Sequence, residues 1–195
     1  KKVKYVNLNE LLPVTSLSNK DEINVIIDSR SLFDFFYIDF YKNMIPDFIS
    51  SSNEVLASFY NYIAHYNNFL NNLGIYKINY FVIYNSKEDE IRNEYDPEFC
   101  NKKNSKGTKI TFINFLLNKA KEISKYFRNI SIIDGQGIDN HFIPAVLCSK
   151  KAVNTNKFTF IISEDEFFVQ YSLLFKNFYN IRASTSDGKI IKKNE

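Results

Sequence analysis

Five short apolar runs alternate along the chain with longer segments in which apolar residues recur at steps of three and four. Most of the short runs are continuously apolar, as expected for strands that are buried on both faces of a sheet. They are Asn24–Asp28, Ile78–Tyr84, Asn129–Ile133, Phe158–Ile162 and Phe178–Arg182. The pattern predicts an α/β fold with a largely parallel central sheet and helices on both faces, in three layers.

Four helices are expected between these strands, with apolar stripes at 55–73, 108–127, 142–147 and 164–175. Gly74 is a suitable C-terminal stop for the first helix. We expect Phe142 in the third helix and Leu174 in the fourth to face the sheet. No internal repeat or linker divides the sequence, so it is interpreted as one domain, 1–195, with a polar insertion at 86–107.

Composition excludes several classes of protein. With 195 residues, 45% of them hydrophobic and 24% charged, the chain can bury a core and is not of the disordered type. A net charge of +3 allows a nucleic-acid partner without requiring one. Cys100 and Cys148 are too few for a disulfide framework or a complete zinc site, which favours the cytoplasm. No apolar run approaches the length of a membrane span, so no membrane partner is expected.

Polar side chains follow the ends of the predicted parallel strands, where such sheets bind ligands. They are Asp28, Asn85, Asp134, Asp139 and Glu164–Glu166. Clustered carboxylates can hold Mg²⁺, and two ions about 4 Å apart can activate water and stabilise a leaving phosphate oxygen. The alternative is that these acids are helix N-caps, and composition alone favours it. Asp28 is the exception, because the sequence Asp-Ser-Arg-Ser has both capping and ligand potential.

The histidines and cysteines give weaker indications. Neither His65 nor His141 has a companion at metal-ligand spacing. His65 is expected near the surface of a helix, and His141 in a first helical turn, with contact to a phosphate as the alternative. Cys148 is expected to be a small core residue, and Cys100 lacks a histidine partner for nucleophilic catalysis. Phosphate-binding glycine motifs are absent.

Basic and aromatic residues interleave within the polar insertion at 86–107, a length that is typical of a binding loop. They are Arg92, Tyr95, Phe99, Lys102, Lys103 and Lys106. Such a mixture suits a single nucleic-acid strand, because cations meet the phosphates and bases stack on the rings. The competing interpretation is a solvated loop whose aromatic residues pack back onto the domain, and the residues alone leave the two equal.

Taken in order, these segments resemble the family of flap endonucleases and 5′→3′ exonucleases, particularly the phage-type 5′ nucleases with a PIN-like domain. The family's opening strand, which ends in a metal-binding Asp, is similar to VIIDSRSLF. The second-strand block, which leads into a helical arch, is similar to FVIYNSKEDEIRNEYDPEFCNKK. The block that opens with Glu-Ala-Asp-Asp is similar to GIDNHFIPAVLCSKK, and the Ser/Thr-Gly-Asp-Lys-Asp block resembles FTFIISEDEFFVQYS. The closing segment NIRASTSDGKIIKK resembles the β-ribbon that follows. The four blocks cover nearly the whole chain.

The resemblance implies that Asp28, Asp139 and Asp165 correspond to metal-binding, catalytic acids. Other acids of the family are replaced, by Asn85, Gly137, Asn140 and Phe167. In the arch, Cys100 stands where a lysine is usual, whereas Arg92, Phe99 and Lys103 keep the basic and aromatic character. Two Mg²⁺ carry four positive charges, which the family offsets with about half a dozen carboxylates, so three acids leave an ion pair poorly neutralised. We therefore expect at most one weakly held Mg²⁺ or Mn²⁺ and no required cofactor.

These points lead us to expect a 5′-nuclease-like domain that cuts nucleic acid poorly or not at all. It would act as a nucleic-acid-binding or protein-docking module in viral or phage replication or transcription, in the host cytoplasm, with DNA favoured over RNA. The residues expected to contact nucleic acid are Arg92, Phe99, Lys102, Lys103 and Lys106. Two alternatives stay open: an active Mg²⁺-dependent 5′ nuclease with rearranged ligands, and a purely protein–protein subunit of a larger complex.

Overall fold

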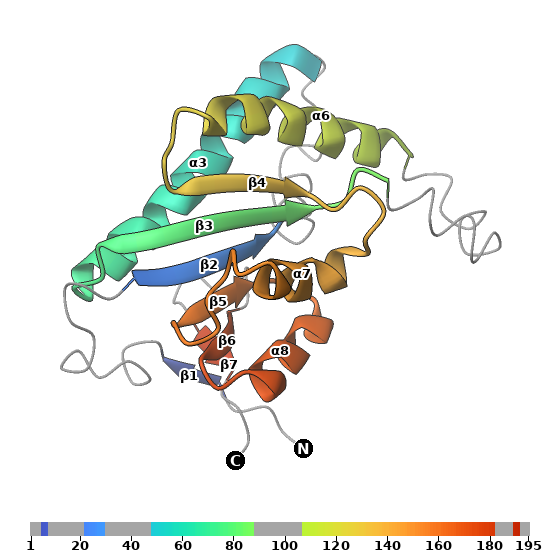
Figure 1. The fold of residues 1–195 in the computed structure, drawn as a ribbon. Coiled ribbons are helices and arrows are strands. Elements are labelled where there is room, and N and C mark those ends of the chain that lie inside the picture. Colours follow the sequence, from blue (N-terminus) through green and yellow to red (C-terminus); the bar gives the residue numbers. More distant parts are fainter. Residues whose placement is uncertain (1–4, 8–21, 30–47, 88–106, 182–188, 192–195) are drawn as a thin grey trace.

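The fold is built on one mixed sheet. The computed structural model describes residues 5–7, 22–29, 48–87, 107–181 and 189–191. Within them, seven strands pair in the order β1-β7-β6-β5-β2-β3-β4 (Figure 1). The five central strands are β2 (Glu22–Asp28), β3 (Lys77–Tyr84), β4 (Ile130–Asp134), β5 (Thr159–Ile162) and β6 (Phe178–Ile181). All neighbours among these five pair in parallel, which confirms the predicted α/β fold.

Two short strands extend this sheet beyond β6. Strand β7 (Lys189–Ile191) pairs antiparallel with β6, and β1 (Tyr5–Asn7) pairs antiparallel with β7. The β6–β7 pair agrees with the ribbon expected near the end of the chain, whereas β1 was not predicted.

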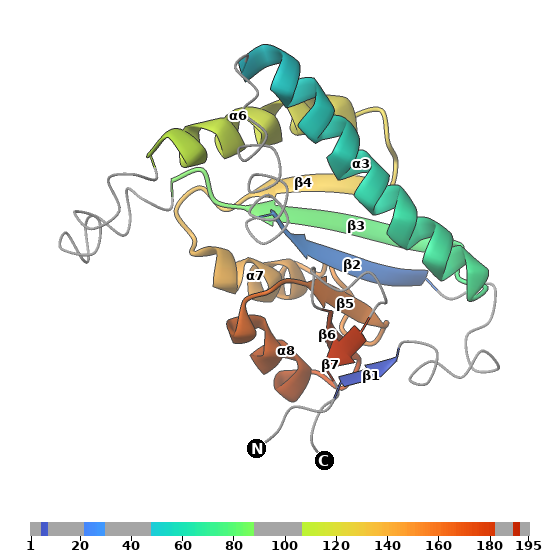
Figure 2. The ribbon, with the colours of Figure 1, turned by 180° about the vertical axis from the view of Figure 1, so that it is seen from behind.

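Helices cover both faces of the sheet (Figures 1 and 2). On one face lie α3 (Phe48–Asn72) and α6 (Gly107–Ser124). On the other face, the 3₁₀ turn η2 (Asn140–Phe142) leads into α7 (Ile143–Ser149), and η3 (Glu166–Phe168) leads into α8 (Val169–Leu174). Side chains alternate across a strand, so Val25 and Ile27 of β2 pack in the core under α3 and α6, and Ile26 packs with α7 and α8.

The end of α3, and the exposure of one residue in η2 and one in α8, test the helix boundary and the apolar faces predicted from the sequence. The first helix stops as predicted, because Gly74 has a positive φ of 82° and its N–H donates to the Asn71 carbonyl. Phe142 and Leu174 were expected to face the sheet, and this is wrong: they are 54% and 72% exposed. A 3₁₀ turn precedes both α7 and α8, and its three-residue period rotates the apolar positions away from an ideal α-helical stripe.

The helices also bear on membrane association. Among the described residues, none of them combines the length and the apolar character needed to cross a bilayer.

Candidate functional site

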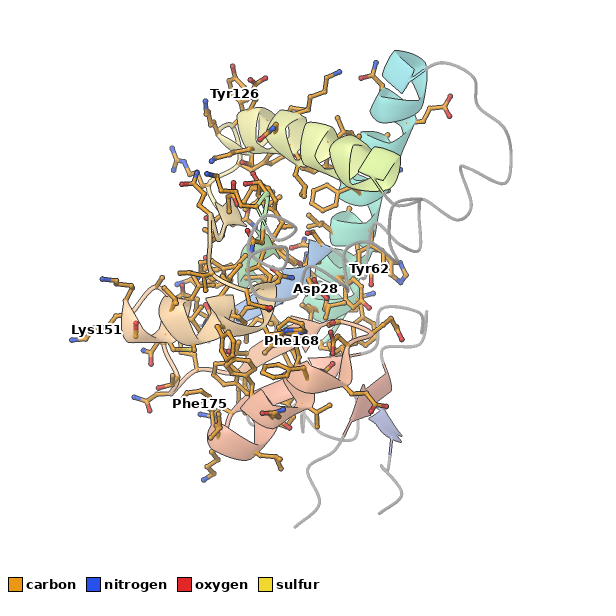
Figure 3. All side chains as sticks on the ribbon, turned by 90° about the vertical axis from the view of Figure 1, so that its right-hand side faces the viewer. Asp28, Tyr62, Tyr126, Lys151, Phe168 and Phe175 are labelled. Atoms are coloured by element: carbon orange, nitrogen blue, oxygen red, sulfur yellow. The ribbon has the colours of Figure 1, made fainter. Side chains whose placement is uncertain are left out.

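The carboxyl ends of the parallel strands meet at one edge of the sheet. The register pairs Ile27 with Ile162 and Tyr84 with Asp134, so the residues that follow β2, β3, β4 and β5 lie side by side. Figure 3 views the domain from this side, with Asp28 near the centre between the two helical layers. We call this edge, formed by residues 28–29, 85–87, 134–141 and 163–167, the carboxyl edge.

Asp28 is the buried centre of the carboxyl edge. It ends β2 on the face that also carries Ile26, and it is 1% exposed. The Asn140 amide Nδ2 donates to Oδ1 at 2.7 Å, and the Ser163 hydroxyl donates to Oδ2 at 2.7 Å. A buried carboxylate is costly unless it accepts hydrogen bonds, so these two donors keep Asp28 stable inside the fold.

The residues Asp139, Asn140 and His141, which we call the 139–141 turn, supply donors to the carboxyl edge. Asp139 caps η2, because its Oδ1 accepts the N–H of His141 at 2.9 Å. Asn140 is 4% exposed and points its amide nitrogen at Asp28, while its Oδ1 has no hydrogen-bond partner among the described residues. The sequence resemblance places an Asp at this position, and the amide replaces a like-charged neighbour of Asp28 with a donor.

The His141 ring lies between two carboxylates. Its Nδ1 is 2.8 Å from Asp139 Oδ1, and its Nε2 is 2.7 Å from Asp165 Oδ2. Asp165 also caps η3, since its Oδ1 accepts the Phe167 N–H at 2.9 Å. The N-cap interpretation of these acids is therefore right for Asp139 and Asp165, and a histidine joins the two caps.

Other polar residues of the carboxyl edge fix its loops. Asp134 accepts hydrogen bonds from the Ser86 hydroxyl at 2.7 Å and from the N–H groups of Ser86 and Gln136, both at 3.1 Å. Burial raises the pKa of Asp134, but these hydrogen bonds outweigh it and lower the pKa below the usual 3.8. Asn85, which stands where the resemblance expects an Asp, donates to the Ile138 carbonyl at 2.8 Å. Both residues hold loops in place.

The loop before the 139–141 turn also limits where acids can be placed. Gly137, which replaces a glutamate of the resembled block, has a φ of 118°. L-residues with a side chain rarely adopt this conformation, so a carboxylate at 137 would strain the loop. Glycine at 137 therefore fits the local backbone.

The described side chains of the carboxyl edge do not fit a two-ion metal site. Both oxygens of Asp28 and both oxygens of Asp165 accept hydrogen bonds from protein donors, and the His141 ring fills the space between Asp139 and Asp165. In the part of the chain that the structure describes, no group of three or more His, Cys, Asp or Glu side chains is arranged so that it could hold a metal ion. Glu164 and Glu166, which flank Asp165, are exposed.

The other predicted site residues lie away from the carboxyl edge or outside the described residues. The residues expected to bind nucleic acid lie outside the described residues; they are Arg92, Tyr95, Phe99, Lys102, Lys103 and Lys106. His65 is exposed on α3, as expected. Sequence reasoning missed Asn140 and Ser163 as donors to Asp28 and His141 as a bridge. Their one signal in the sequence was that each lies within two residues of a cap aspartate, Asp139 or Asp165.

Comparison with known proteins supports the fold. No protein-family model matches the chain, and no curated protein is significantly similar to it. Among solved structures, the bacteriophage T5 D15 protein co-crystallised with metal ions is similar with a TM-score of 0.50 and 13% sequence identity. The alignment covers 86% of this chain and 56% of that one. The T5 5′-exonuclease with bound zinc gives a TM-score of 0.51 at 13% identity, over 86% of this chain and 57% of that one.

The chain has a 5′-nuclease-like fold. It spans a little over half the length of either T5 chain, and at this identity the likeness concerns the fold alone. The 5′-nuclease-like sheet nevertheless brings the ends of β2, β4 and β5 to one edge, and the side chains at that edge are those described above.

Proposed function

We propose that this 5′-nuclease-like domain binds nucleic acid and has little or no nuclease activity. The observation that carries the proposal is the hydrogen bonding of its acids. Asp28 is held by Asn140 and Ser163, and Asp139 and Asp165 are held by His141. Metal-dependent phosphodiester cleavage needs carboxylate oxygens that are open to cations. Here both oxygens of Asp28, both oxygens of Asp165 and Oδ1 of Asp139 are already engaged by protein groups.

The carboxyl edge is mostly negative, so a phosphate backbone would need cations from another segment of the chain to bind near it. Its described side chains include six carboxylates, Asp28, Asp134, Asp139, Glu164, Asp165 and Glu166. Against them stands one lysine, Lys87. Phosphates are repelled by such an edge unless cations lie nearby, so we propose that the basic residues of 88–106 supply them, with Phe99 as a stacking surface. DNA is the preferred strand in this proposal, and the process is viral or phage replication or transcription.

A binding experiment tests this proposal directly. Labelled single-stranded, flap and duplex DNA, and RNA of the same sequence, are titrated in EDTA over a range of salt concentrations. We expect affinity to fall with salt, with a slope of about −0.7 for each phosphate neutralised on a single strand. The triple variant Lys102→Glu/Lys103→Glu/Lys106→Glu is expected to flatten that slope.

The matched control is Lys150→Glu/Lys151→Glu. These lysines are exposed and follow α7, a seven-residue helix that leads away from the 139–141 turn. They therefore lie about 10 Å or more from the start of that helix, and the control is expected to keep the wild-type salt slope. Equal losses in both variants would indicate general charge attraction and contradict a site at 88–106.

Cleavage is tested on the same substrates in Mg²⁺ and in Mn²⁺. We expect no product above background. Robust cleavage that disappears in Asp28→Ala would overturn the proposal in favour of an active nuclease with rearranged ligands.

A second candidate function is that of a protein-binding subunit. Large apolar side chains are exposed on the α7–α8 side, where Leu173 is 61% exposed and both Phe142 and Leu174 exceed half. Large apolar side chains that are exposed together often mark a protein interaction site. Absence of salt-dependent nucleic-acid binding, together with a defined complex that Leu173→Ser/Leu174→Ser disrupts, would favour this candidate.

A further inference from the structure

The His141 ring is fixed by packing as well as by charge. Its centroid lies 4.4 Å from that of Phe167 and 5.6 Å from that of Phe168. Phe167 stands where the sequence resemblance expects an acid. The phenylalanine therefore puts an apolar ring against the imidazole of His141.

The backbone of the 139–141 turn is anchored from α8. The Tyr171 hydroxyl donates to the His141 carbonyl at 2.7 Å and accepts the Ala145 N–H at 3.2 Å. Tyr171 is 4% exposed, so water competes little for these bonds. These two hydrogen bonds hold the backbone of the 139–141 turn in place, independently of the charges on its side chains.

Side chains of the 139–141 turn contact three acids of the carboxyl edge, Asp28, Asp139 and Asp165. Both nitrogens of the His141 ring face a carboxylate oxygen, Nδ1 at 2.8 Å from Asp139 and Nε2 at 2.7 Å from Asp165. Asp139 and Asp165 belong to different elements, 26 positions apart in sequence. The ring joins them as a bridging cation would. Next to it, Asn140 places a neutral donor on Asp28.

We propose that the 139–141 turn is a built-in substitute for a divalent cation. In this proposal, His141 bridges Asp139 and Asp165, Asn140 satisfies Asp28, and the carboxyl edge stays assembled whether or not metal is available. The inference deepens the proposed function and rests on it, since it explains how a non-cleaving domain keeps an acidic edge folded. A metal ion would have to displace the packed His141 ring to bridge the two carboxylates in its place.

Thermal unfolding and calorimetric titration with Mn²⁺ alone, at pH 7, test the proposal. Wild-type protein is expected to show the same Tm in EDTA and in 10 mM Mn²⁺, with no measurable heat of binding. His141→Asp removes the bridge and adds a third carboxylate. We expect a lower Tm in EDTA and a rise of about 3–6 °C when Mn²⁺ reaches ten times its Kd.

The second histidine provides the matched control. His65 is exposed on α3 and its ring contacts Tyr66, so His65→Asp makes the same chemical change far from any bridge. It is expected to leave both the Tm and the response to Mn²⁺ unchanged.

Asn140→Asp is a second test variant that preserves side-chain shape. It is expected to bind Mn²⁺ at least tenfold more tightly than wild type. If His141→Asp does not fold, the Mn²⁺ affinity of Asn140→Asp tests the proposal in its place.

Two results would overturn the proposal. One is tight Mn²⁺ binding by wild-type protein that His141→Asp does not improve. The other is a destabilised His141→Asp or Asn140→Asp whose Tm does not respond to Mn²⁺, which would make the turn an ordinary structural contact. DNA binding in EDTA is measured on the same samples. Loss of the metal response with DNA binding intact refutes only the substitute-cation inference, and loss of DNA binding with the metal response intact refutes only the proposed function.

Discussion

Ser163 and Asp28, 135 residues apart in sequence, are joined by a 2.7 Å hydrogen bond at the ends of two adjacent parallel strands. The same Ser163 hydroxyl accepts the N–H of Asp165 at 3.0 Å. One buried hydroxyl thus connects the end of β2, the end of β5 and the cap of η3. This arrangement makes Asp28 part of the framework of the carboxyl edge.

Ser163→Ala should therefore destabilise the domain more than an ordinary serine substitution does. It removes a hydrogen bond to a carboxylate that is 1% exposed, and bonds to charged groups contribute about 1.5–3 kcal/mol. We expect a loss of that size in the free energy of unfolding, measured with urea. Ser149→Ala is the control, because its exposed hydroxyl donates only to the Val146 carbonyl one turn away, and it should cost about 0.5 kcal/mol or less. Equal losses at the two positions would contradict the framework role of Ser163.

Tyr171→Phe tests the anchoring of the 139–141 turn. The variant keeps the ring in its core but removes the hydroxyl that bonds the His141 carbonyl and the Ala145 N–H. We expect a loss of about 1–3 kcal/mol, because two backbone groups lose their partner. The readout specific to the turn is the chemical shift of the His141 ring protons in an NMR spectrum, which should move. Tyr126→Phe, at a side chain that is 88% exposed, should leave both stability and that shift unchanged.

The sheet could be predicted from sequence because its signal is local. The parallel strands are continuous apolar runs, and each predicted boundary lies within two residues of the observed one. Strand β1 was missed because three residues, Tyr5–Asn7, are too few to form a pattern, and their partner β7 lies at the other end of the chain.

The site could be predicted only in part. The sequence signal that ends a strand or begins a helical turn is local. Asp28 was therefore correctly placed at the carboxyl edge, and Asp139 and Asp165 at the starts of helical turns. That His141 lies between the two caps depends on the angle at which two short 3₁₀ turns approach each other, and no spacing within the sequence encodes that angle. The exposure of Phe142 and Leu174 has the same origin, since short 3₁₀ turns change the rotation of the helices that follow.

Asp134→Asn should remove part of the acid sensitivity of the fold. The pKa of Asp134 lies below its usual value, since hydrogen bonds from Ser86 and Gln136 outweigh burial. The ionised carboxylate therefore stabilises the native state above about pH 3.8, and this stabilisation is lost as pH falls through the lower native pKa. Between about pH 5 and pH 2.5, the free energy of unfolding should fall less steeply in Asp134→Asn than in wild type. Glu122→Gln, at an exposed position of α6, should keep the wild-type dependence, and a matching dependence in Asp134→Asn would show that this carboxyl does not contribute.

Asn180→Leu is expected to stabilise the domain. Asn180 lies in β6 and is 1% exposed, and neither its amide nitrogen nor its amide oxygen has a hydrogen-bond partner among the described residues. Burying an unpaired amide costs about 1–3 kcal/mol, and leucine has a similar shape without that cost. Urea unfolding should show a gain of about that size. The control is Asn24→Leu, because Asn24 is also buried but its amide donates to the Thr159 hydroxyl at 3.4 Å, so the same substitution there should give no gain. A loss of stability in Asn180→Leu would mean that the amide is paired in solution, and hydrogen exchange at Ile181 and Ile191 would then locate the affected strands.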